Sequence, residues 1–212
     1  MAKSMNVSIK TKGIVLCQYD AKHGADALFL VYTREMGRIL VGARGVKKMS
    51  SKLAGHLATF GIVDLNIAGN RDVRQLIGAV LLQQIGHNSE EDERARNFFK
   101  EFVARAITKE ERDIVFWDLL ENFLLKMSLN KKFVQLRLFC YVFAIKALAR
   151  LGYFSVDLEE KYFPARLNKD FIQDVLSNKN SVGISIAALD ELGIGLKKLA
   201  GDSFEKEMKA WI

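Results

Sequence analysis

The chain has 212 residues, of which 50% are apolar and 27% charged, so its composition is that of a folded globular protein. No stretch approaches the roughly 20 consecutive apolar residues of a membrane span, and the first residues lack the apolar core of a secretory signal. We therefore expect a cytoplasmic protein. Two cysteines, Cys17 and Cys140, lie far apart in apolar surroundings, which argues against a disulfide framework and against a zinc site built from cysteines alone.

The net charge of +7 is concentrated in the first 80 residues. These hold twelve Lys and Arg against five Asp and Glu, whereas residues 81–212 hold twenty of each. Within residues 34–52, six cations accompany one acid, Glu35. Such asymmetry suggests an N-terminal module that binds a polyanion, joined to a neutral domain. An idle basic surface would give the same composition.

The first 80 residues are predicted to form short β-strands. Segments rich in β-branched and aromatic residues predict strands at residues 13–19, 25–33, 37–43, 60–68 and 73–80. Between the third and fourth strands, Ser50 or Ser51 could cap a short helix that places Leu53, Leu57 and Phe60 on one face. Five strands with a helix in that position predict an OB-fold β-barrel over residues 1–80.

From about residue 88 the apolar period changes from two to 3.6, which predicts an all-α domain over residues 81–212, and hence an α+β chain. Ser89 should begin a helix that runs to about Ile107, and a capping box at 108–111 should begin the next. A nearly all-apolar helix is expected at 133–148. Beyond it we expect an irregular segment at residues 152–166. Three weaker helices should follow, at residues 168–176, 185–192 and 202–211.

No pattern predicts catalysis. The chain lacks a phosphate-binding G-x-x-x-x-G-K-[ST] loop, and its three histidines lack metal-ligand spacing. The glycine-rich residues 193–201 follow a helix and not a strand, which disfavours a dinucleotide site. We expect no enzyme, cofactor or metal. A hydrolase using the acidic residues 90–93 is a weaker alternative, which metal-dependent turnover would reveal.

The stretch ARGVKKMSSK, residues 43–52, is the main candidate site. In the predicted layout it leads into the N-terminus of the short helix, whose free N–H groups and flanking lysines would hold phosphate. Gly45 would let the backbone approach a ligand closely. Tyr19 or Tyr32, on the strands, could stack on bases, and binding would be sequence-tolerant because lysines alone do not read bases. Exterior tyrosines with no role are an equal alternative.

The same region resembles the RecO family of bacterial recombination mediators. The family pattern combines T-x-x-x-G, A-R-G-hydrophobic-basic and S-x-L-x-x-x-L-x-x-F. It is matched by Thr33, Gly37, Ala43, Arg44, Gly45, Val46, Lys47, Ser51, Leu53, Leu57 and Phe60. A weaker resemblance continues in ALARLGYFSVDLEE, residues 147–160.

The resemblance implies an OB-fold domain followed by a helical domain in a DNA repair and recombination protein of the RecFOR pathway. It implies binding to single- and double-stranded DNA, annealing of complementary strands, and cooperation with RecR in loading RecA onto DNA coated by single-strand-binding protein. The DNA contacts that it implies are Arg44, Lys47, Lys48 and Lys52, with Arg34 and Arg38 as flanking candidates.

Partner binding has a weaker candidate site at Lys126, Lys131 and Lys132, where a plain solvated helix end is the alternative. Many family members also place four zinc-binding cysteines after the G-Y element, but residues 151–212 contain no cysteine. We expect packing of Tyr162 and Phe163 to replace such a site. The runner-up function is an OB-fold adaptor that binds protein or RNA and not DNA, which competition by RNA of equal length would separate from the first.

Overall fold

The computed structural model describes residues 8–57, 59–69, 74–84, 89–107, 110–127, 133–154, 161–163, 174–175 and 184–204. The chain divides into two compact units. The barrel unit comprises residues 1–86 and 108–124, and the helical unit comprises residues 87–107 and 125–212. The segment 108–124, expected in the helical domain, therefore groups with the barrel.

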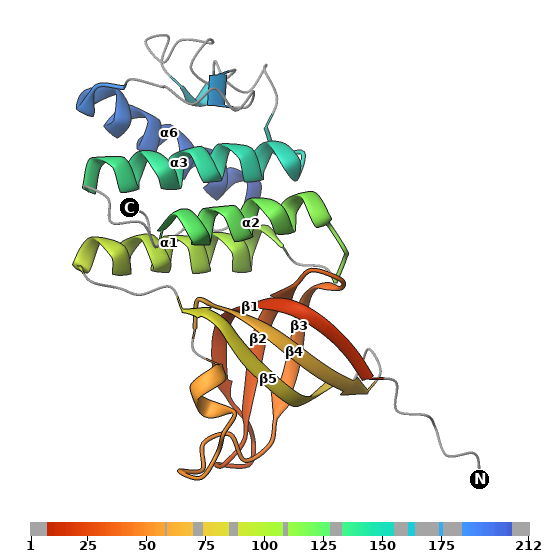
Figure 1. Ribbon diagram of the computed structural model, residues 1–212. Helices are drawn as coiled ribbons and strands as arrows, with labels where there is room; N and C mark the ends of the chain where they lie inside the picture. Colours follow the sequence, from red (N-terminus) through yellow and green to blue (C-terminus); the bar gives the residue numbers. More distant parts are fainter. Residues whose placement is uncertain are drawn as a thin grey trace. The chain divides into compact units, whose positions relative to one another are not determined.

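The described part of the barrel unit contains five strands, β1 Ser8–Asp20, β2 Ala27–Thr33, β3 Gly37–Ala43, β4 Gly61–Gly69 and β5 Arg74–Gln84 (Figure 1). They close into a barrel in the order β1-β2-β3-β5-β4, and β3 and β5 are the parallel pair. This confirms the predicted OB fold. The expected boundary at residue 80 falls inside β5, because this strand continues its pairing with β4 to Gln84.

The first strand allows the barrel to close because it pairs with two neighbours. Residues 8–14 of β1 pair with β4, and residues 13–20 pair with β2. The register shifts between Val15 and Cys17, and such a bulge bends a strand. Inward-facing residues of every strand then enclose one apolar core, which includes Val15, Phe29, Val41, Leu65 and Leu76.

The segment between β3 and β4 differs from the predicted α-helix. Its helical part is a single 3-10 turn, η1 Ala54–His56, without a side-chain cap. Leu57 and Phe60, which suggested a helical face, are each 4% exposed, and the Phe60 N–H donates to the Val15 carbonyl at 2.8 Å. Burial of these side chains holds the segment in an irregular path. The predicted phosphate site at a helix N-terminus is therefore wrong.

The described helices are α1 Glu90–Ala106, α2 Ile114–Met127, α3 Phe133–Arg150 and α6 Ile186–Phe204. Ser89 caps α1 as predicted, since its hydroxyl accepts the Asp92 N–H at 3.2 Å. The next helix, predicted to begin at the capping box 108–111, begins later, at Ile114, and residues 108 and 109 of the box lie outside the described residues. Asp113 precedes α2, and its carboxylate accepts the Phe116 N–H at 2.9 Å. None of the described helices has the length and apolarity that a bilayer span requires.

Helix α6 runs as one element through the glycine-rich stretch, where a break was expected. A Cβ on Gly193 would overlap the Tyr141 hydroxyl, and one on Gly195 would overlap Tyr162 and Phe163. Residues without a side chain are therefore needed where these aromatic residues contact α6. The two glycines allow this close packing and do not break the helix.

Tyr162 and Phe163 are 8% and 5% exposed, and the Tyr162 hydroxyl donates to Asp202 at 2.6 Å. Aromatic packing thus fixes the described residues 161–163 against α6. No group of three or more His, Cys, Asp or Glu within the described ranges is placed to hold a metal ion. Residues 151–212 contain no cysteine, so they cannot form the four-cysteine zinc site that the resemblance implied for many family members.

Candidate nucleic-acid interface

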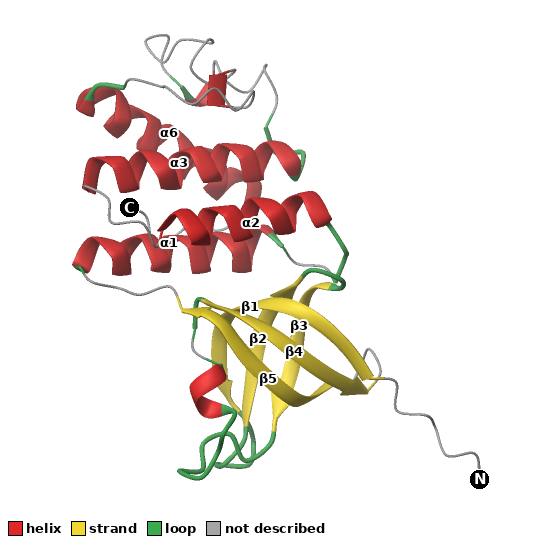
Figure 2. Cartoon of the chain, viewed as in Figure 1, coloured by secondary structure: helices red, strands yellow, loops and turns green. Residues whose placement is uncertain are grey.

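The predicted basic stretch leaves β3 and forms a loop at the end of the barrel where the β1–β2 loop also lies (Figure 2). Val46, which is 4% exposed, packs into the barrel core between the exposed Arg44 and Lys48. The Lys47 N–H donates to the Ala25 carbonyl of the β1–β2 loop at 3.0 Å. One buried side chain and one backbone hydrogen bond therefore hold this loop in place while its cations face outward.

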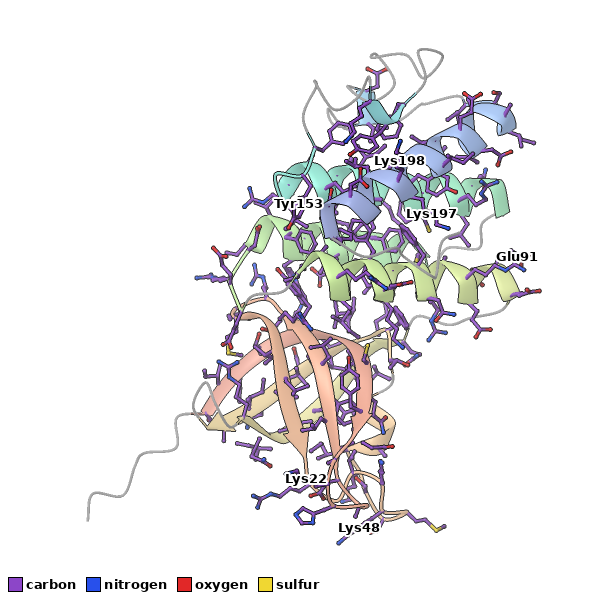
Figure 3. All side chains as sticks on the ribbon, turned by 180° about the vertical axis from the view of Figure 1, so that it is seen from behind. Lys22, Lys48, Glu91, Tyr153, Lys197 and Lys198 are labelled. Atoms are coloured by element: carbon purple, nitrogen blue, oxygen red, sulfur yellow. The ribbon has the colours of Figure 1, made fainter. Side chains whose placement is uncertain are left out.

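Cations from both loops form a group that we call the basic loop cluster: Lys22, Arg44, Lys47, Lys48 and Lys52. Figure 3 shows Lys22 and Lys48 projecting from the same end of the barrel. Lys22 was missed by the sequence interpretation because it lies far from the basic stretch along the chain. The sequence did contain a signal for Lys22, because it lies in the turn that joins the first two predicted strands. Antiparallel pairing of β1 with β2 and of β2 with β3 brings this turn to the same end of the barrel as the loop that follows β3.

Two described carboxylates near these loops, Asp20 and Asp26, are already engaged. Asp20 forms an ion pair with Lys47, and the Lys47 hydrogen bond keeps the pKa of the Asp20 carboxyl below its ordinary value. Asp26 accepts the Gly45 N–H at 2.7 Å. Gly45 has a φ of +62°, so a left-handed turn requires glycine here. The Gly45 N–H is engaged by Asp26, so the expectation that its backbone serves a ligand is not supported.

The remaining cations of the cluster have no acidic partner in the part of the chain that the structure describes. Lys22, Arg44, Lys48 and Lys52 make no ion pair with any described residue. All four are exposed. The loop end of the barrel therefore presents four full positive charges to solvent, whereas the charge of Lys47 is largely offset by Asp20.

Apolar side chains are exposed on the outer face of the strands that lead into these loops. Tyr19 is 48% exposed and lies next to Asp20, and Leu40 on β3 is 49% exposed. Strand register aligns Tyr19 with Leu28 and Leu28 with Gly42, so Tyr19, Leu28 and Gly42 form one row across β1, β2 and β3. Partial burial raises the pKa of the Tyr19 hydroxyl, so the ring is neutral at physiological pH. A neutral aromatic ring beside free cations suits a base and its phosphate.

Tyr32, the other predicted stacking residue, is unavailable. It is 1% exposed, and its ring stacks on Trp117 with centroids 6.4 Å apart and planes 11° apart. Phe116 meets the same ring edge-on at 5.6 Å. The residues of α2 that belong to the barrel unit thus cover Tyr32. Its predicted role is wrong because nothing in the strand sequence indicates that a distant helix packs on this face.

Arg34 and Arg38 lie at the other end of the β2–β3 hairpin from the basic loop cluster. Arg34 follows β2 in the turn, and Arg38 is the second residue of β3. Strands of this length separate the two ends by roughly 20 Å. The structure therefore brings together Arg44, Lys47, Lys48 and Lys52 but places the two flanking arginines elsewhere on the barrel.

The weaker partner site is described only in part. Lys126 is exposed near the end of α2, and Lys131 and Lys132 lie outside the described residues. In the helical unit, burial and then the charge of Lys126 lower the pKa of Lys146 on α3.

Strand order, barrel closure and exposed loop cations define an OB-fold protein with a cationic loop surface. Residues 5–85 match the family model described as recombination protein O N terminal. Residues 5–85 therefore form a RecO N-terminal domain, which confirms the resemblance to the RecO family, and this domain supports a role in DNA repair and recombination. No curated protein matches the chain significantly.

Proposed function

We propose that this protein is a non-enzymatic mediator of recombinational repair that binds single- and double-stranded DNA through the basic loop cluster. The observation that carries the proposal is the set of four cations without acidic partners among the described residues, beside the exposed Tyr19, on a RecO-family barrel. Phosphates bind to the cations, and a single strand gains further from stacking of a base on Tyr19. A duplex, whose bases are already stacked, uses the cations alone.

Annealing of complementary strands follows from the same electrostatics. Two strands repel each other through their phosphates, and cations that neutralise part of this charge lower the cost of bringing them together. This requires no catalytic residue and no cofactor. Since lysine contacts to phosphate carry no sequence information, the basic loop cluster holds a strand whatever its sequence.

The partners proposed are RecR, single-strand-binding protein and, indirectly, RecA, which the protein helps load onto coated DNA in the cytoplasm at the nucleoid. The exposed Lys126 near the end of α2 is the proposed contact for an acidic partner segment on the helical unit. Substituting Lys126 by Gln would weaken that contact without altering the barrel loops.

The test is fluorescence-anisotropy binding of a labelled single strand across a salt series. Four engaged phosphates give a log–log slope of roughly −3, and the variant Arg44→Gln/Lys48→Gln/Lys52→Gln should reduce it to roughly −1. The matched control, Arg94→Gln/Arg112→Gln/Lys198→Gln, removes the same charge from exposed positions outside these loops. Circular dichroism establishes that all three proteins are folded.

The outcomes separate the proposal from the alternative. Equal losses in the variant and the control would move the DNA site away from the loops. Salt-insensitive or absent DNA binding by the unchanged protein, or RNA that competes better than DNA of equal length, would overturn the proposal in favour of an adaptor that binds protein or RNA.

A further inference from the structure

A second basic surface lies on the barrel away from the loops. A hollow of about 540 Å³ opens where β1, β4 and β5 run side by side, next to the β2–β3 turn. Strand register sets two rows of outward side chains across it: Lys10, Asn66 and Gly78 form one row, and Lys12, Asp64 and Val80 form the other. The hollow forms because Gly78 adds no side chain in the row where Asn66 is its neighbour.

Three cations edge this hollow: Lys10 and Lys12 from β1, and Arg34 from the β2–β3 turn. Lys10 makes no ion pair with a described residue. Lys12 lies 3.9 Å from Glu121, and Arg34 lies 3.9 Å from Glu35, with about half of each cationic side chain exposed. Contacts at this distance and exposure contribute little. The three cations are therefore free to turn toward a ligand.

The acidic and amide groups of the hollow have different roles. Glu35 accepts the Thr11 hydroxyl, which ties the β2–β3 turn to β1. Asp64 is exposed, and the Asn66 side-chain oxygen has no hydrogen-bond partner among the described residues. Asp64 can accept a hydrogen from an amino group of a ligand, whereas the Asn66 oxygen is buried from solvent. Beside them Val80, 55% exposed, offers a flat apolar surface.

The cations at the edge of the hollow, the Asp64 carboxylate and the apolar Val80 side chain together match one chemical class of ligand. A nucleotide carries a phosphate for the cations and an apolar base face for Val80. The exocyclic amino groups of adenine, cytosine and guanine can donate to the exposed Asp64. Lys10 and Lys12 recur about 7 Å apart along one strand, which suits an extended polyanion. An acidic peptide fits less well, because it would place carboxylates against Asp64.

We propose that this hollow binds a nucleotide unit of a second nucleic-acid strand, while the basic loop cluster holds the first. The inference rests on the proposed DNA-binding function and deepens it. Arg34 and the basic loop cluster are at opposite ends of the β2–β3 hairpin, roughly 20 Å apart. One barrel can therefore hold two strands at separate sites, which is the arrangement that annealing needs.

The test uses the full chain and two labelled, non-complementary oligonucleotides, oligo(dT) as first strand and oligo(dC) as second, with energy transfer between the labels reporting co-binding. Light scattering identifies complexes that contain one copy of the protein. The variant Lys10→Gln/Arg34→Gln should bind the first strand within twofold of the unchanged protein and the second at least tenfold more weakly. The control Arg94→Gln/Arg112→Gln should match the unchanged protein in both.

A charge-neutral variant gives an independent readout. In Gly78→Val the new Cβ meets its nearest atom, Asn66 Cβ, at an ordinary 3.8 Å, so the added side chain is accommodated and narrows the hollow. It should lose second-strand binding and keep first-strand binding. A second strand of oligo(dT) should bind at least fivefold more weakly than oligo(dC), because thymine lacks an amino group.

The outcomes distinguish this inference from the function on which it rests. A protein that binds no strand at all overturns the proposed function. One that binds a first strand but no second within a single copy overturns this inference alone. Second-strand binding that survives both Lys10→Gln/Arg34→Gln and Gly78→Val, or an acidic peptide that binds at Lys10 and Arg34 in place of the second strand, would also overturn it.

Discussion

The two ends of the β2–β3 hairpin carry similar charges and have different surroundings. At one end Arg44 and Lys48 leave the barrel on loops, without acidic partners among the described residues. At the other end Arg34 and Arg38 flank a turn whose neighbour Tyr32 is covered by Trp117. In sequence the two pairs of cations are indistinguishable. What distinguishes them is which distant segment packs beside each.

The difference is also seen in the two tyrosines of this sheet. Tyr19 is 48% exposed beside the open end, whereas Tyr32 is 1% exposed under α2. A ring at the open end is free for a ligand, and a ring at the covered end stabilises the fold. Substitutions that separate binding from stability therefore test the comparison directly.

The largest expected effect is on stability at the covered end. Trp117 is fully buried, stacks on Tyr32 and donates from Nε1 to Glu121 at 3.1 Å. Trp117→Ala should lower the free energy of unfolding of the barrel unit by about 3–5 kcal/mol, as measured by urea unfolding followed by circular dichroism. Val115→Ala, at a position 59% exposed, is the control and should change it by less than about 0.5 kcal/mol. Equal effects would mean that α2 does not cover the barrel in solution.

The sequence was sufficient to predict the barrel because the residues of each strand carry a local pattern of apolar, β-branched and aromatic side chains. The five strands follow from alternation and composition and form where expected, whereas the cations of residues 43–52 lie on an irregular loop and not at the predicted helix N-terminus. The covering of Tyr32 could not be predicted, since it depends on a contact with Trp117, 85 positions later in the chain. The same limit applies to residues 50–60, where Leu57 and Phe60 are spaced as in a helix but are buried in the barrel.

The next effect is on binding at the open end. Tyr19→Ala should weaken binding to a single strand by about 1–3 kcal/mol, the range for loss of one stacked base, and leave duplex binding nearly unchanged. Anisotropy with single- and double-stranded oligonucleotides of one sequence measures both. Tyr19→Phe keeps the ring and should bind as the unchanged protein does. Equal loss on single strand and duplex would show that Tyr19 supports the loops and does not stack.

The smallest effect concerns the paired cation of the basic loop cluster. Asp20 offsets the charge of Lys47, so Asp20→Asn should free this lysine for a phosphate. We expect single-strand binding to become two- to threefold tighter and the salt slope to steepen by roughly 0.7, the value for one added phosphate contact. Lys47→Gln should weaken binding instead, because Asp20 then adds an unpaired negative charge. Unchanged binding in Asp20→Asn would mean that Lys47 does not reach the DNA.

The ion pair itself is visible in the titration of Asp20. The Lys47 hydrogen bond holds the pKa of this carboxyl below its unfolded value of about 3.9. Any stabilisation from the pair is therefore present above that pH and is lost as the pH falls through the lower, folded pKa. Carbon-13 NMR of the Asp20 carboxyl should give a midpoint below 3.9 that returns toward it in Lys47→Gln. A midpoint unaffected by Lys47→Gln would mean that the pair does not form in solution, and Lys47 would then count as a fifth free cation at the open end.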